Sequence, residues 1–353
     1  GKQSKLILLA KLHETHSQLT IVTLLPFPRL SWNLTAAFLA GLLGAGSLAG
    51  PSAVQAQAAT TPPPVSQGEF GILVMAHGGD STWNRTVDQA IAPLRRSHPI
   101  VVAFGMANPE TLSSGLDSLR RLGVQRIAVV RLFISRRSFL PETRYLLGLS
   151  PERPSVVAAA TTASHPGNAP PAATGHAAVP LIPIDHQLVV ATEESGLMDS
   201  PVAEIIVQTR ARMAGRNPGT ESVLLLAHGM GHEEENRQLL EAMSRAAVLV
   251  RSDGFHTVRT ATLREDWSGP RALAEAEIRA FVAAETSAGR QVLVVPYRLS
   301  GLGPYAKVLE GLEYLATDGF LPHDGVTEWI LETARTIACR ARWAGTGDCG
   351  MVR

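Results

Sequence analysis

Two segments of the chain each place a histidine directly after a short apolar run. Residues 71–79 read GILVMAHGG and residues 222–230 read SVLLLAHGM, so His77 and His228 each lie within an Ala-His-Gly triplet. An apolar run of this length, ended by glycine and followed by a helical pattern, predicts a buried parallel strand that leads into a helix. Ligands of open α/β sheets bind beyond the carboxyl ends of the strands. Each histidine is therefore expected where a ligand would bind.

The order of the predicted elements indicates two units of alternating strands and helices. In the first unit we expect strands at 70–76, 100–104 and 126–133, and helices at 82–96, 109–122 and 141–149. In the second we expect strands at 188–191, 222–227, 256–263 and 291–296, and helices at 201–214, 233–250, 270–288, 304–315 and 326–342. Such alternation predicts parallel sheets with right-handed crossovers. GVQRIAVVRLFIS in the first unit matches GRQVLVVPYRLS in the second, which indicates a duplication. The expected fold is two similar doubly wound α/β domains facing a cleft.

Composition divides the chain into six parts. These are a leader (1–58), a proline-rich spacer (59–69), a first domain (70–150), an Ala/Pro-rich linker (151–183), a second domain (184–342) and a C-terminal tail (343–353). The linker has too few large apolar residues to bury much surface, which predicts a flexible segment.

The leader carries the pattern of a secretory signal. Residues 34–49 are small or apolar and uncharged; Arg29 precedes them and Ala56-Gln-Ala58 follows them. The run is shorter than the roughly 20 residues of a membrane-spanning helix, and a small-x-small sequence after such a run is typical of a cleavage site. We expect cleavage after Ala58 and export to the periplasm, with no membrane span left afterwards. An uncleaved anchor is the alternative.

Charge and cysteine content narrow the function classes. The formal net charge of +1 gives no electrostatic case for nucleic-acid binding. The chain has no phosphate-binding P-loop motif, and no Gly-x-Gly-x-x-Gly follows its first strand, which disfavours a nucleotide cofactor. Without a Cys-x-x-Cys pair, thiolate metal sites are also disfavoured. In an oxidising compartment Cys339 and Cys349 could form a disulfide; two unpaired thiols are the alternative.

The loops after the third strands supply candidate ligand-binding groups. The candidates are Ser135, Arg136, Arg137 and Ser138 in the first unit, and Ser300, Gly301 and Gly303 in the second. Arginines and hydroxyls suit carboxylates, and glycines at a helix start suit an anion. Solvated loop residues are the alternative. Asp80 and the glutamates at 233–235 follow the two histidines, and we interpret them as helix N-terminal acids rather than as partners of the imidazoles.

Residues 101–133, VVAFGMANPETLSSGLDSLRRLGVQRIAVVRLF, together with the MAHGG before them, resemble the class II chelatases. The resemblance is to sirohydrochlorin cobaltochelatases of the CbiX type in a tandem form. It covers about residues 70–340 and extends to ETRYLLGL (142–149), the histidine-bearing linker and LPHDGVTEWI (321–330). It implies the insertion of Co²⁺ or Fe²⁺, as a substrate, into sirohydrochlorin, with the tetrapyrrole as the small-molecule partner.

The resemblance also implies roles for individual residues. His77 would bind the metal and act as the base, and His228 would be a metal ligand in the second unit. In the family a second histidine lies in the loop after the third strand, which here would fall within 135–139, most naturally at Arg137. No histidine is found there or at 300–305. Imidazole suits both a metal ligand and a base, whereas arginine can only pair with acidic side chains of the ring. The alternative is therefore a non-catalytic exported protein that binds a metal or a tetrapyrrole.

Overall fold

The computed structural model describes residues 70–154 and 181–343, and within them it contains two parallel four-stranded sheets. The first sheet, in the order β2-β1-β3-β4, consists of β1 (Gly71–Ala76), β2 (Ile100–Phe104), β3 (Arg126–Leu132) and β4 (Val189–Thr192). The second, in the order β6-β5-β7-β8, consists of β5 (Glu221–Ala227), β6 (Thr257–Thr262), β7 (Gln291–Pro296) and β8 (Leu315–Ala316). The two orders are the same, and the expected fold of two similar doubly wound α/β domains is confirmed.

Helices connect the strands. They are α1 (Ser81–Ile91), α2 (Pro109–Arg121), α3 (Leu140–Leu146), α5 (Pro201–Ala214), α6 (Glu233–Ser252), α7 (Ser268–Ser287), α8 (Tyr305–Val308) and α9 (Asp324–Arg340). A side chain caps the first turn of α1, α2, α5 and α9. At the start of α2, the Asn108 side chain accepts hydrogen bonds from the backbone N–H groups of Glu110 and Thr111, and Pro109 occupies the first turn.

One predicted helix is much shorter than expected. The helix predicted over 304–315 is present only as α8, which ends at Val308, and Leu315 belongs to β8. Gly311 has a φ of +80°, a left-handed conformation that turns the chain away from the helix axis. The residues after this turn then run along the open side of β7 and pair with it in parallel.

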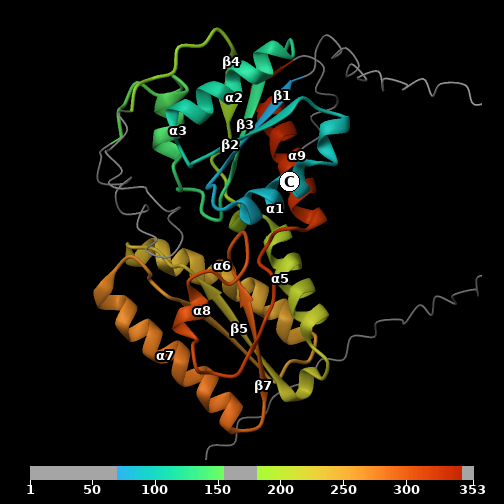
Figure 1. Ribbon diagram of the computed structural model, residues 1–353, viewed down its shortest axis with the longest axis vertical. Coiled ribbons are helices and arrows are strands. Elements are labelled where there is room, and N and C mark those ends of the chain that lie inside the picture. The colour runs from blue at the N-terminus through green and yellow to red at the C-terminus, as the bar shows by residue number, and fades with distance from the viewer. Residues whose placement is uncertain (1–69, 155–180, 344–353) are drawn as a thin grey trace, which may run out of the picture. The chain divides into compact units, whose positions relative to one another are not determined.

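Two helices cross between the sheets. Helix α5 follows β4 of the first sheet but packs on α6 and β7, and α9 follows the second sheet but packs on β3, β4 and α1 (Figure 1). The Oγ1 of Thr327 on α9 donates to the Ala90 carbonyl of α1 over 2.6 Å. Chain order alone predicts that residues 184–192 open the second domain. In the structure β4 pairs with β3, because strand pairing and not chain order decides which sheet a strand joins.

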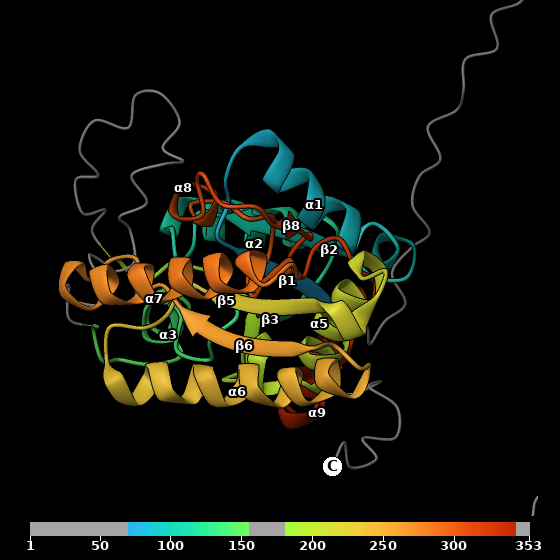
Figure 2. The ribbon, with the colours of Figure 1, turned by 90° about the horizontal axis from the view of Figure 1, so that it is seen from below.

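Both faces of each sheet are covered by helices, which explains the uninterrupted apolar runs. In the second lobe, α6 and α7 lie on opposite sides of β5 and β6 (Figure 2). In the first lobe, Ile72 and Val74 face one apolar cluster, and Leu73 and Met75 face another. The first of these clusters continues into the second lobe through α5 and α9. Among the described residues, no helix has the length and apolar character needed to cross a bilayer.

Candidate functional site

His77 and His228 are the first residues beyond two buried central strands. The Nδ1 of His77 lies 2.7 Å from its neighbour's carbonyl oxygen, and the Nδ1 of His228 lies 2.9 Å from the equivalent oxygen. A carbonyl only accepts, so each Nδ1–H donates, and the lone pair of a neutral ring is then on Nε2. The glycines that follow, Gly78 and Gly229, have φ values of +80° and +88°. The His-Gly pair is therefore a turn that fixes the direction of the imidazole.

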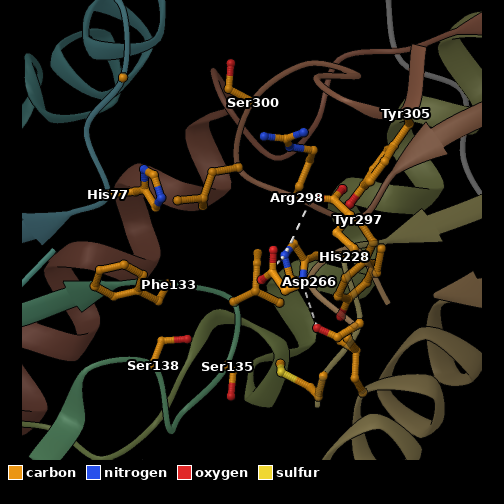
Figure 3. A pocket seen from close by; sticks show the side chains of 18 of the residues that line it. His77, Phe133, Ser135, Ser138, His228, Asp266, Tyr297, Arg298, Ser300 and Tyr305 are labelled. Carbon is orange, nitrogen blue, oxygen red and sulfur yellow. Dashed lines mark hydrogen bonds and ion pairs between the residues drawn. The ribbon is translucent and has the colours of Figure 1, made fainter. Parts of the chain in front are cut away.

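Both histidines line one cavity of about 270 Å³, whereas the sequence left open whether the two would share a site. The cavity lies beyond the carboxyl ends of the strands, and Figure 3 shows the two imidazoles on different sides of it. Its walls are largely apolar, and they include the aromatic side chains of Trp83, Phe133, Phe139, Trp267, Tyr297 and Tyr305. A mostly apolar cavity with a few polar groups is the usual form of a site for a small organic ligand.

Two buried carboxylates from the loop after β6 face His228. Its Nε2 lies 3.1 Å from Oδ2 of Asp266 and 3.6 Å from Oε2 of Glu265. Both carboxylate side chains are 6% exposed, against 33% for the imidazole. Burial lowers the pKa of His228, but the hydrogen bond to Asp266 and the charge of Glu265 outweigh burial, so the pKa is raised. Burial in turn raises the pKa of Glu265, against the opposing charges of His228 and Arg298.

Each imidazole also packs against a tryptophan. The ring centroids of His77 and Trp83 are 6.2 Å apart, and those of His228 and Trp267 are 5.8 Å apart with the rings at 90°. Trp83 lies on α1, whereas Trp267 is the residue before α7. The two tryptophans thus reach equivalent histidines from different connections of the two sheets.

The predicted ligand-binding loops are only partly at the cavity. Ser135, Ser138 and Ser300 line it, whereas Gly301 and Gly303 do not. Arg136 and Arg137 do not line it either: they pair with Asp199 at 2.6 Å and with Glu235 at 3.1 Å. Within residues 135–139, where the resemblance predicts a second histidine, Ser135, Ser138 and Phe139 line the cavity and Arg137 does not.

Arg298, the residue after Tyr297 at the end of β7, is the arginine that does line the cavity. Neither it nor the Glu265–Asp266 pair was predicted from the sequence. Both follow directly from strand ends, so the rule that ligands bind beyond the carboxyl ends of strands could have found them. Glycine and histidine after a strand carry a stronger sequence signal than these charged residues do.

The acids predicted to act at helix N-termini do so. The Asp80 side chain caps α1, accepting from the backbone N–H groups of Thr82 and Trp83 at 2.9 and 2.8 Å. Of the three glutamates at the start of α6, Glu233 pairs with Arg264 and Glu235 with Arg137. Cys339 is disulfide-bonded, and because Cys349 lies outside the described residues, its pairing stays a prediction.

The cavity brings together ligand types that suit a divalent ion, namely two imidazoles and two carboxylates. As the side chains stand, residues 70–154 and 181–343 contain no group of three or more His, Cys, Asp or Glu side chains close enough to hold a metal ion together. Nε2 of His228 is instead directed at the carboxylates. An ion that binds there would have to displace the proton that these groups share.

No protein-family model matches the chain, and no curated protein matches it. Among solved structures, it is similar to SirB from Bacillus subtilis with Fe³⁺, at 14% identity and a TM-score of 0.49, covering 78% of this chain and 97% of that one. It is also similar to the sirohydrochlorin chelatase SirB from Bacillus subtilis subspecies spizizenii in complex with cobalt, at 12% identity and a TM-score of 0.48, covering 78% and 97%. A multi-domain protein from Deinococcus radiodurans with structural similarity to chelatases is 19% identical with a TM-score of 0.44, covering 75% and 54%. The fold therefore rests on the strand orders, and the function on the residues of the cavity.

Proposed function

We propose that this chain is a chelatase-type protein that inserts a divalent ion, Co²⁺ or Fe²⁺, into sirohydrochlorin in the cavity between its two lobes. The observation that carries the proposal is that His77 and His228, from separate sheets, line the same aromatic cavity, with two buried carboxylates beside one of them. The sequence resemblance to the class II chelatases supports the same chemistry.

The reaction needs groups that hold the ion and groups that accept protons. Insertion exchanges two pyrrole N–H protons of the tetrapyrrole for one divalent ion, so two protons must leave the cavity. Neutral imidazole provides a ligand for the ion and a base that titrates near neutral pH. His77 is the proposed ligand and base. His228 holds the ion on the other side, and Asp266, which faces its Nε2, takes part in proton removal.

The aromatic side chains of the cavity support a tetrapyrrole as its ligand. Flat aromatic side chains such as Trp83, Trp267 and Phe133 offer apolar surface to a flat macrocycle, and stacked aromatic pairs stabilise each other by about 0.5–1.5 kcal/mol beyond buried area. The serines of the two loops, Ser135 and Ser300, provide hydroxyls at the edge of that surface.

A second candidate is a non-catalytic protein that binds the metal or the tetrapyrrole without joining them. It is favoured by the absence of a three-ligand group among the described side chains and by serines where the family carries a second imidazole. Export, which we also propose from the leader at 1–58, fits this candidate better, because tetrapyrrole synthesis is usually cytoplasmic.

The test is the absorbance of sirohydrochlorin with Co²⁺ in the presence of the protein, against a blank without protein. The proposal predicts insertion faster than the blank, with at least tenfold loss in His77→Ala and in His228→Ala. His256→Ala is the matched control, since His256 is exposed and lies just before β6, at the opposite end of the same sheet. Tight binding of the tetrapyrrole with no gain in rate would contradict the enzyme and support the second candidate.

A further inference from the structure

The loop after β7 brings one guanidinium, that of Arg298, to the cavity. Its Nη1 donates to the Leu302 carbonyl over 3.3 Å, and its Cζ lies 5.4 Å from the centre of the Tyr305 ring. Among the described residues, no carboxylate oxygen lies within 4.0 Å of its guanidinium, although the charge of Glu265, which lines the same cavity, acts on it. A guanidinium has five N–H donors. Most of those of Arg298 are therefore left for a ligand.

The first lobe has an apolar residue at the equivalent position. Leu132 pairs with Ala76, the residue before His77, and Pro296 pairs with Leu226, so Tyr297 stands opposite the residue before His228. One residue further on, Phe133 in the first lobe corresponds to Arg298 in the second. The ring centroid of Phe133 is 5.3 Å from that of Phe139. The two sides of the cavity thus present an aromatic pair in one lobe and a cation on an aromatic ring in the other.

The surrounding loop holds the guanidinium in place. Tyr305 is fully buried under it, and cations stack favourably on the faces of such rings. Gly303 has a φ of +52°, and a Cβ at this residue would overlap the Arg298 guanidinium. The backbone conformation favours glycine here, and any larger residue would push the guanidinium out of its present position. A guanidinium that is positioned in advance loses less entropy when it binds a ligand.

We propose that Arg298 selects ligands by their acidic side chains, pairing bidentately with a carboxylate at the rim of a tetrapyrrole while Phe133 packs on its apolar part. This inference rests on the proposed function, since it names the residue of the same cavity that recognises the carboxylate side chains of the tetrapyrrole. Guanidinium–carboxylate pairs combine charge with a fixed two-bond geometry, which makes them specific as well as strong. Arg298 lines the cavity, and Figure 3 shows its guanidinium on the side of Ser300 and Tyr305.

The test compares the affinities of the protein for two ligands, a metal-free porphyrin that carries propionate side chains and its methyl ester. Quenching of tryptophan fluorescence measures the binding of each. The wild type should bind the acid at least tenfold more tightly than the ester. Arg298→Gln should remove this preference for the acid. Arg298→Lys keeps the positive charge but loses the two parallel N–H donors of the guanidinium, so it should retain part of the preference. Gly303→Ala, which displaces the guanidinium without removing it, should also weaken binding of the acid.

Two controls separate this inference from the proposed function. Arg237→Gln removes an exposed arginine of α6 that pairs with Glu234 and Glu241, and should leave the preference unchanged. Phe133→Leu should weaken binding of the acid and the ester alike. Equal affinities of the wild type for the two porphyrins, or an equal loss of both in Arg298→Gln, would overturn the role of Arg298 and leave tetrapyrrole binding intact. Failure of either porphyrin to bind the wild type would overturn both.

Discussion

The contact between His228 and two buried carboxylates predicts a stability difference that depends on pH. Replacing His228 by glutamine keeps a polar side chain of similar length but removes the positive charge that faces Asp266 and Glu265. The two carboxylates, each 6% exposed, would then face each other without it. The loss should be largest where the imidazole is protonated.

The size of the stability loss follows from the burial of the His228 imidazole and of the Asp266 and Glu265 carboxylates. Leaving one partner of a fully buried ion pair alone costs about 3–5 kcal/mol, while an exposed pair contributes about 0.2–1 kcal/mol. Here the carboxylates are buried, but the imidazole is 33% exposed and screened by water. We therefore expect His228→Gln to lower the free energy of unfolding by about 1–2 kcal/mol at pH 6.

The sign of the pH dependence follows from the raised pKa of His228. A pKa that is higher in the folded than in the unfolded protein gives stability that is fully present below the unfolded value of about 6.5. That stability is lost as the pH rises through the folded value. The difference between wild type and His228→Gln should therefore be largest near pH 6 and small near pH 9.

Thermal unfolding at these two pH values, followed by circular dichroism, provides the measurement. A loss of 1–2 kcal/mol corresponds to a decrease in Tm of roughly 2–4 °C for a protein of this size. His256→Gln, at the opposite end of β6, serves as the control for a histidine that does not face these carboxylates. A decrease that is equal at pH 6 and pH 9, or larger at pH 9, would refute the account of the His228 charge.

Three further predictions concern the metal, the core and the leader. Co²⁺ binding, measured by calorimetric titration, should tighten as the pH rises from 6 to 8. The pKa of His228 is raised, so its imidazole keeps a proton that the ion must displace. An affinity that does not change over this pH range would contradict this prediction. Arg131→Met should destabilise the protein by about 3 kcal/mol or more, measured by urea unfolding. The guanidinium, whose pKa burial lowers to about 10, donates to the carbonyls of Ser138, Arg136 and Glu193, and these bonds would be lost. A loss below about 1 kcal/mol would mean that water replaces these bonds. N-terminal sequencing of the native protein should begin near Ala59, and recovery of the intact leader from the soluble cytoplasm would exclude export.

The sequence was sufficient for the central strands and for the two histidines. β1 and β5 are buried on both faces, so their residues must be apolar without alternation, and the glycine after each histidine adopts a conformation that other residues rarely do. Both constraints are local and visible in the sequence. The bounds of β2, α5 and β7 were predicted to the residue for the same reason.

Features of the fold that depend on pairing between distant residues were not visible in the sequence. The sheet that β4 joins and the sheets that α5 and α9 cover are decided by packing over long separations, not by a pattern in these segments. The same holds at the site. Nothing local distinguishes Arg137, which pairs with Glu235, from Arg298, which lines the cavity. Nor does the sequence show that His77 and His228 share one cavity.

The number of tetrapyrrole molecules bound per chain tests most directly whether the two lobes build one site. We predict one porphyrin per chain by fluorescence titration, with affinity reduced by His77→Ala and by His228→Ala, because both imidazoles line the same cavity. Two porphyrins per chain, each sensitive to only one of the two substitutions, would contradict a shared site and would assign each histidine to a cleft of its own.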